Sequence, residues 1–96
     1  MFIVSVQYQQ PLEVVESHLQ AHVAFLDTYF ATGVFIASGR KVPRTGGFIL
    51  AQGVTRPELE AIVAKDPFKF NGVAAYEITE VAPNRTARGY EQLLNL

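Results

Sequence analysis

His22 and Asp66 lie far apart in the chain, and both side chains are suited to acid–base chemistry. A histidine titrates near neutral pH, so it can take up or release a proton at a reacting group. An aspartate that binds one ring nitrogen of a histidine sets the tautomer and leaves the other nitrogen free to face a pocket. The two residue types therefore raise the hypothesis of a pair.

Both residues also have a purely structural interpretation. His22 lies beside the apolar stripe of a predicted helix, where a histidine can pack at an edge and bind a backbone carbonyl. Asp66 stands directly before Pro67. An aspartate in this position commonly starts a turn in which its side chain bonds the backbone two residues further on. Residue type and spacing leave both interpretations open.

His18 and His22 have the i, i+4 spacing of two metal ligands on one helix face. The residues between them lack the glutamate of the H-E-x-x-H motif, and a third ligand would have to come from Asp66 or Glu77. The chain contains no cysteine, which removes thiolate ligands, disulfides and cysteine nucleophiles. We therefore predict no metal and no cofactor.

The segment ASGRKVPRTGG combines exposed glycine backbone with Arg40, Lys41 and Arg44. Such a loop can hold an anion, or it can be a solvated hairpin connection. It is not a P-loop, because G-x-x-x-x-G-K-[ST] is absent. Ser38, just before it, and Tyr76 could each point a hydroxyl into a pocket. A serine hydrolase is not expected, because the chain has no G-x-S-x-G elbow.

Hydrophobic periodicity predicts the elements that must position these residues. Strict alternation over residues 2–8 predicts a strand. Apolar residues at steps of three and four predict one helix from Pro11, tolerated in a first turn, to a stop at Gly33. Two further strands, 34–38 and 48–52, are joined by the glycine-rich loop.

The rest of the chain predicts a second helix, a fourth strand and a short C-terminal turn. Thr55 and Glu58 have capping-box spacing ahead of an apolar run, and the helix ends near Lys65. A strand follows at 73–81, and YEQLLNL forms a short helical turn. The order β-α-β-β-α-β predicts a ferredoxin-like α+β fold, with two helices on one face of a four-stranded antiparallel sheet. The other face needs cover, which a second copy of the chain would provide.

Length, composition and charge bound the class of protein. Ninety-six residues predict one domain, with a core at about 1–82 and a tail at 83–96. The net charge of −1 argues against nucleic-acid binding, since such domains usually carry a basic face. The N-terminus has no signal-peptide pattern, and no apolar run reaches the roughly 20 residues of a membrane helix. We expect a soluble, cytoplasmic protein that does not bind membranes.

The ordered set of motifs resembles the YciI-like (YCII-related) family over about residues 1–82. The segments that carry the resemblance are AHVAFLD with His22, IASGRKVPRTGGFILA from Ile36 to Ala51, KDPF from Lys65 to Phe68, and YEITE from Tyr76 to Glu80. The resemblance implies a ferredoxin-like fold of the dimeric α+β barrel type, assembled as a homodimer through the sheets.

The resemblance also implies a site. The family's histidine and aspartate meet as a proposed catalytic dyad, which corresponds to His22 and Asp66 here. The small residues Ala37, Ser38 and Gly39 would line the same pocket. One branch of the family removes chloride from a chlorinated hydroxyquinol in an elimination assisted by proton transfer.

Two hypotheses follow. In the first, the protein is a lyase or isomerase in which His22 moves a proton on a small oxygenated cyclic compound. Ser38 and the loop N–H groups, Gly39 among them, would hold a substrate oxygen. Phe25, Phe68 and Tyr76 would form the apolar wall of the pocket. In the second, the protein is a non-catalytic dimeric module that binds a ligand, with an anionic one left open, or a partner protein.

Overall fold

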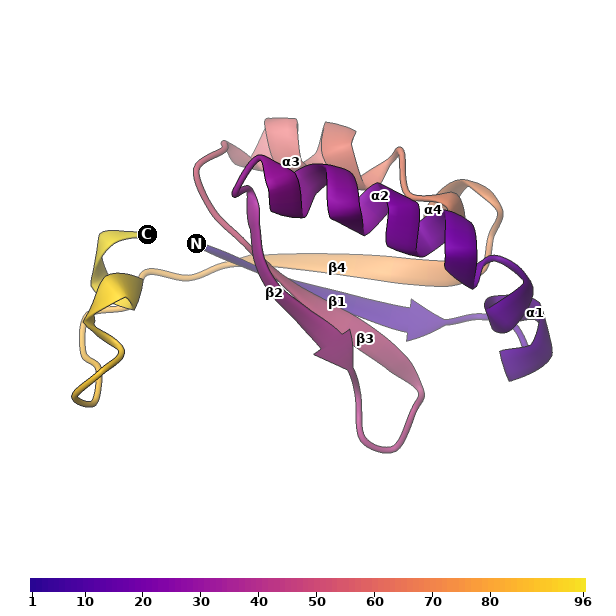
Figure 1. Ribbon diagram of the computed structural model, residues 1–96, viewed down its shortest axis with the longest axis horizontal. Helices are drawn as coiled ribbons and strands as arrows, with labels where there is room; N and C mark the ends of the chain where they lie inside the picture. Colours follow the sequence, from indigo (N-terminus) through magenta and orange to yellow (C-terminus); the bar gives the residue numbers. More distant parts are fainter.

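A four-stranded antiparallel sheet carries a layer of helices on one of its faces, and the first short helix lies at the end of the sheet (Figure 1). The computed structural model describes residues 1–96. The strands are β1 (Phe2–Tyr8), β2 (Phe35–Arg40), β3 (Gly46–Ala51) and β4 (Ala74–Glu80). The helices are α1 (Leu12–Ser17), α2 (Leu19–Ala31), α3 (Arg56–Val63) and α4 (Pro67–Phe70), and the 3-10 helix η1 (Glu91–Asn95) closes the chain.

The strand order is β2-β3-β1-β4, which is the order of the predicted ferredoxin-like fold. β1 occupies an inner position and pairs with both β3 and β4, so that Val4 lies opposite Ile49 and Ile78. The alternation in β1 is the one predicted, because Phe2, Val4 and Val6 are buried. The fold class predicted from the sequence is confirmed.

The core fills the space between the sheet and the helices. It consists of 13 buried apolar residues: Phe2, Val4, Val6, Val15, Phe25, Phe35, Ile49, Ala51, Leu59, Val63, Phe68, Val73 and Ala74. Aromatic rings meet at one end, where Phe35 lies 5.8 Å from Phe25 and 5.3 Å from Tyr29 between ring centroids. Strands and helices of both halves of the chain therefore share one hydrophobic core.

The first helix is interrupted, which corrects the prediction of one helix from Pro11 to Gly33. His18 has φ −105° and ψ 0°, so α1 ends before it and α2 begins after it. Its backbone N–H donates to the carbonyl of Val15, a three-residue step that tightens the last turn of α1. The break places His22 in the first turn of α2.

A short helix that was not predicted follows the second predicted helix. α3 ends at Val63, and the short helix α4 follows with Asp66 as its N-cap. The backbone of Asp66 is extended, with φ −70° and ψ 124°, as expected of a residue before proline. The phenylalanine N–H two residues on donates to Asp66 Oδ1 at 2.9 Å, so the predicted turn bond is confirmed.

The strands of the β2–β3 hairpin extend further into the glycine-rich loop than the predicted 34–38 and 48–52. Gly46 and Gly47 belong to β3 and pair with Gln7 and Val6 of β1. A Cβ atom at Gly46 would collide with the carbonyl oxygen of Val6, so only glycine permits this close approach.

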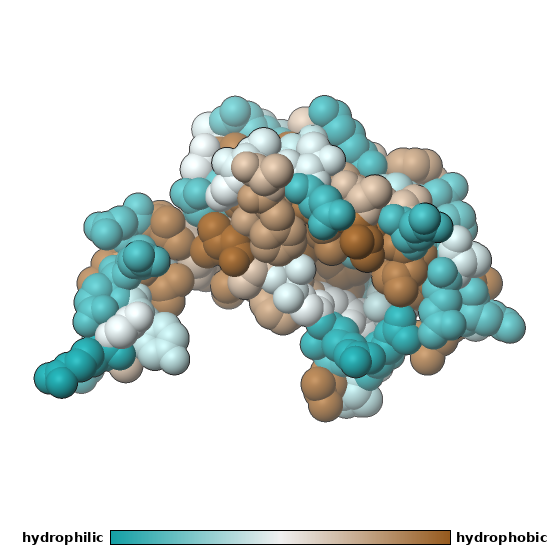
Figure 2. All heavy atoms as spheres, viewed as in Figure 1, coloured by the Kyte–Doolittle hydropathy of each residue, from teal (hydrophilic) through white to brown (hydrophobic).

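Figure 2 shows mostly hydrophilic residues over the hairpin and the C-terminal tail, with hydrophobic residues along the helical layer between them. None of the helices has both the length and the hydropathy needed to cross a bilayer.

Candidate active site

The fold brings His22 and Asp66 together although they are 44 residues apart in sequence. His22 Nδ1 lies 2.9 Å from Asp66 Oδ1, which is within hydrogen-bond distance. The Asp66 side chain is fully buried, whereas 13% of the His22 side chain remains exposed. The two interpretations of Asp66 are both met by the geometry, because the same oxygen also accepts the N–H bond within the α4 cap.

Asp66 receives hydrogen bonds from three elements of the fold. His22 belongs to α2, the Phe68 N–H to α4, and the Tyr76 hydroxyl of β4 donates to Oδ2. A buried carboxylate is costly unless hydrogen-bond donors replace the lost water. No buried side-chain nitrogen or oxygen in the protein lacks a partner. The interior is therefore built to hold this carboxylate in one orientation.

Tyr76 is a donor at this position because its hydroxyl keeps its proton. Burial and, after it, the hydrogen bond to Asp66 raise the pKa of Tyr76 above its ordinary value. The ammonium group of Lys69 lies 5.7 Å from the centre of the Tyr76 ring. Tyr76 thus contacts Asp66 from the side that His22 does not use.

The imidazole of His22 is held by aromatic contact as well as by Asp66. Its ring stacks on Phe68 with 3.9 Å between centroids and 2° between planes, and Phe25 lies 6.4 Å away. An ionised aspartate can only accept hydrogen bonds, so Nδ1 carries the hydrogen and Nε2 of the neutral ring has a lone pair. Nε2 is not buried and makes no hydrogen bond within the chain. An imidazole held in this way can accept a proton at Nε2.

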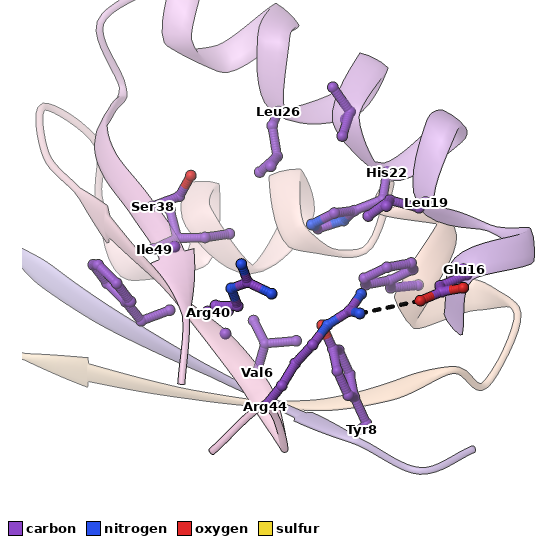
Figure 3. Close-up of a pocket in the computed structure, with 15 residues that line it drawn as sticks. Val6, Tyr8, Glu16, Leu19, His22, Leu26, Ser38, Arg40, Arg44 and Ile49 are labelled. Atoms are coloured by element: carbon purple, nitrogen blue, oxygen red, sulfur yellow. Dashed lines mark hydrogen bonds and ion pairs between the residues drawn. The ribbon is translucent and has the colours of Figure 1, made fainter. Parts of the chain in front are cut away.

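His22 lines an open cavity of about 580 Å³ between α2 and the β2–β3 hairpin (Figure 3). Its apolar wall is formed by Val6, Leu19, Val23, Leu26, Phe48, Ile49 and Phe68, and its polar groups come from Tyr8, Glu16, His22, Ser38, Arg40 and Arg44. A mostly apolar cavity with a few converging polar groups has the composition of a small-molecule site. No residue of the tail, 83–96, lines it.

The structure places the predicted site residues in two groups. Ser38, Gly39 and Phe68 line the cavity together with His22. Phe25 and Tyr76 do not form its wall: Phe25 packs into the aromatic end of the core, and the Tyr76 hydroxyl is turned to Asp66. Phe25 therefore contacts the His22 ring and Tyr76 contacts Asp66, on the side away from the cavity wall. The sequence did not predict these contacts, because both depend on packing between distant elements.

Four polar residues of the cavity were missed or left open. Arg40 and Arg44 line it, whereas Lys41 of the same loop does not. Tyr8 and Glu16 were not singled out at all. A signal for Tyr8 was available, because it continues the buried face of β1 at the end of the predicted strand.

His18, between α1 and α2, and His22, in α2, do not face a common point. His18 Nδ1 lies 3.5 Å from the side-chain amide of Asn71, on the exposed side of the molecule. No three histidine, aspartate or glutamate side chains come close enough to one another to hold a metal ion. The i, i+4 spacing therefore has no third ligand in this fold.

Comparison with known proteins was made at the level of sequence and of fold. Residues 1–82 match the family model of the YCII-related domain. A search of curated protein sequences gave no significant match. A similar solved structure is that of 5-chloro-2-hydroxyhydroquinone dehydrochlorinase from Burkholderia phenoliruptrix AC1100, in complex with 2,5-dihydroxybenzoquinone. The TM-score is 0.72 at 21% identity, over 88% of this chain and 96% of that chain, which shows a shared fold.

Proposed function

Because the chain belongs to the YCII-related family, we propose that it is a small-molecule enzyme in which His22 and Asp66 transfer a proton. The observation that carries this proposal is the 2.9 Å hydrogen bond between His22 Nδ1 and a fully buried carboxylate, at the wall of an open cavity. The substrate class is a small oxygenated cyclic compound, and the reaction is that of a lyase or isomerase.

In the proposed reaction His22 acts as the general base. Nε2 takes the proton of a substrate hydroxyl, and the electron pair of the broken O–H bond forms a carbonyl. In an isomerisation His22 returns the proton to a ring carbon. In an elimination the same return makes the chlorine-bearing carbon tetrahedral; a second hydroxyl then loses its proton and becomes a carbonyl, while the displaced ring electrons expel a chloride ion. Asp66 stabilises the imidazolium form between these steps and keeps Nδ1 protonated.

Ser38 and Gly39 are proposed to bind a substrate oxygen on the β2 side of the cavity. The Ser38 hydroxyl lies on the cavity wall and makes no hydrogen bond within the chain. Phe68 supplies an apolar surface beside the His22 ring, against which a flat ring can lie. The similar dehydrochlorinase was solved with a hydroxylated quinone bound, which supports a cyclic, oxygenated ligand of this size.

The test compares His22→Ala and Asp66→Asn with the unchanged protein. Chlorinated and unchlorinated hydroxyquinols, including 5-chloro-2-hydroxyhydroquinone, are screened by quinone absorbance and chloride release. We expect each variant to lose roughly 10²-fold or more in kcat, because a general base typically contributes 10²- to 10⁴-fold. Circular dichroism verifies that both variants fold.

The matched control is His18→Ala, which removes the neighbouring histidine four residues away. His18 contacts Asn71 and does not line the cavity, so its replacement should leave kcat unchanged. Normal turnover by His22→Ala would end the proposal. Retained ligand binding with no turnover of any substrate by the unchanged protein would favour the non-catalytic binding module instead.

We also propose that the protein is a homodimer joined through the sheet face that the helices leave uncovered. Ile3 and Phe48 on that face are 38% and 36% exposed. Leu50 lies opposite Ile3, and Ala37 lies opposite Leu50, so an apolar surface continues from β1 to β2. A second copy that placed the same surface against it would bury these side chains.

A further inference from the structure

Two arginines of the β2–β3 hairpin line the same cavity as His22, and proton transfer by His22 does not account for them. Arg40 is the last residue of β2, and it points to the helix-covered face because it pairs with Gly47 two positions after Ser38 pairs with Ile49. Arg44 reaches the cavity from the loop. Figure 3 shows both guanidinium groups turned toward the space below His22.

The charges that line the cavity do not cancel. Arg44 Nη1 lies 3.2 Å from Glu16 Oε1, but Arg40 makes no hydrogen bond or ion pair within the chain. Tyr8 and, after it, Glu16 raise the pKa of Arg44, so this guanidinium stays charged. The cavity wall therefore carries two cations, Arg40 and Arg44, and one anion, Glu16. Asp66 does not line the cavity, and its carboxylate is taken up by three donors.

The remaining wall determines what kind of anion fits. Leu19, Leu26, Ile49 and Phe68 give an apolar surface on the helix side and the sheet side. A guanidinium group is planar and binds two oxygens of a carboxylate, or one ionised hydroxyl, in its own plane. A ligand with an apolar ring at one end and a charged oxygen at the other would satisfy both surfaces at once.

We infer that the cavity binds a small ring compound that carries an anionic oxygen group, with this group on Arg40 and Arg44 and the ring against Phe68. The inference rests on the proposed function, since it names the substrate class of the same site. It places the charged group on the hairpin and leaves the rest of the ring within reach of His22 Nε2.

Glu16 acts as the competitor of the ligand in this arrangement. Its side chain is 59% exposed, and its pair with Arg44 is an exposed ion pair of small net stability. A ligand anion can displace it from Arg44 at little cost, while Arg40 is free from the start. Removal of the Glu16 charge should therefore strengthen anion binding, and removal of either arginine charge should weaken it.

Calorimetric titration with two pairs of probes tests the inference. Benzoate and benzamide have nearly the same shape and differ in charge, and so do 4-nitrophenolate, above its own pKa, and 4-nitroaniline. We expect the protein to prefer the anion of at least one pair. Arg40→Gln and Arg44→Gln should each weaken that anion roughly 10-fold or more, because a hydrogen bond to a charged group is lost, without changing affinity for the neutral partner. Glu16→Gln should strengthen anion binding several-fold.

Lys41→Gln is the matched control, because it removes one positive charge from the same loop at a residue that does not line the cavity. An equal loss of affinity in Lys41→Gln and Arg40→Gln would mean that only the general charge of the loop matters, and it would overturn the inference. Equal affinity for both members of each pair, or no binding of either anion, would overturn it too. Preference for one pair alone identifies the group as a carboxylate or an ionised hydroxyl.

The outcomes separate this inference from the proposed function. If Arg40→Gln weakens anion binding while His22→Ala turns substrate over normally, the anion site stands and proton transfer by His22 is wrong. If His22→Ala abolishes turnover while the arginine variants bind both anions as well as the unchanged protein, the proposed function stands and the anion site is wrong.

Discussion

The hydroxyl of Tyr76 donates a hydrogen bond to Asp66 Oδ2, and His22 uses the other carboxylate oxygen. Tyr76 does not line the cavity, so we assign it a positioning role that acts through Asp66. Without this donor the carboxylate can rotate away from His22, and its Oδ2 atom is left buried without a hydrogen-bond partner. The orientation of the imidazole therefore depends on a residue two contacts away from the cavity.

Tyr76→Phe tests this dependence, because it removes one hydroxyl and leaves the ring. A buried acceptor left without its donor costs about 1–3 kcal/mol, so the free energy of unfolding measured in urea should fall by this amount. We expect kcat to fall roughly 10- to 100-fold with little change in KM, since misplacement affects the chemical step. Tyr29→Phe is the control, because the Tyr29 hydroxyl makes no hydrogen bond.

The pH dependence of stability gives a readout that loss of packing alone would not move. The pKa of Tyr76 is raised from its ordinary 10.0, so the neutral form is favoured in the folded state. The contribution of Tyr76 to stability is complete below pH 10.0, the ordinary pKa, and is lost as the pH rises above it and the unfolded chain ionises first. The stability advantage of the unchanged protein over Tyr76→Phe should therefore shrink in urea titrations above about pH 10. An advantage that is constant with pH, or absent, would contradict the role assigned to Tyr76.

At the scale of the elements, the start of α3 depends on a reciprocal pair of hydrogen bonds. The Glu58 N–H donates to Thr55 Oγ1 at 3.3 Å, and the Thr55 N–H donates to Glu58 Oε1 at 3.0 Å. The backbone N–H of Thr55 and, after it, the Thr55 hydroxyl lower the pKa of Glu58. This contribution to stability is present above pH 4.5, the ordinary pKa, and is lost as the pH falls below it.

Thr55→Ala should destabilise the protein by about 1 kcal/mol in urea unfolding, because the helix loses its N-cap. No residue of α3 lines the cavity, so kcat should be unchanged. Thr28→Ala is the matched control: the Thr28 hydroxyl bonds a carbonyl within α2, where it caps no free N–H group. Equal losses of stability in the two variants would show that the cap contributes nothing of its own.

The elements that were predicted well from the sequence carry local signals. Alternation marked β1, and the capping box marked α3 within one residue of its start. The break at His18 and the four-residue helix α4 were not predicted. Neither glycine nor proline marks the break, and four residues are too few to show helical periodicity.

The site shows the same division between local and tertiary information. The motif resemblance joined His22 to Asp66, and the turn before Pro67 explained the position of Asp66 locally. The roles of Phe25 and Tyr76 were assigned to the wrong surface, because hydroxyl and ring directions depend on how β4 and α2 pack. Arg40 could have been separated from Lys41 by strand alternation, once β2 was extended to its observed end.

At the scale of the whole molecule, the sheet face opposite the helices has an apolar half and a polar half. On the side of β3 it carries Ile3, Phe48 and Leu50, whereas on the side of β4 it carries Glu77 and Thr79. Single exposed apolar residues are common, but a contiguous apolar patch on a sheet indicates an interaction surface. A symmetric partner can cover the apolar side with its own and leave the polar side at the rim.

Ile3→Glu tests the proposed homodimer, because it sets a carboxylate in the middle of this patch. We expect sedimentation velocity to show a dimer for the unchanged protein at micromolar concentration and a monomer for Ile3→Glu, since a charge buried in an interface without a partner is strongly unfavourable. Ile3 is already 38% exposed, so the monomer should remain folded by circular dichroism. Ala24→Glu adds the same charge to the exposed surface of α2 and should leave the dimer intact. A monomeric unchanged protein, or a dimeric Ile3→Glu variant, would show that this face does not join two copies.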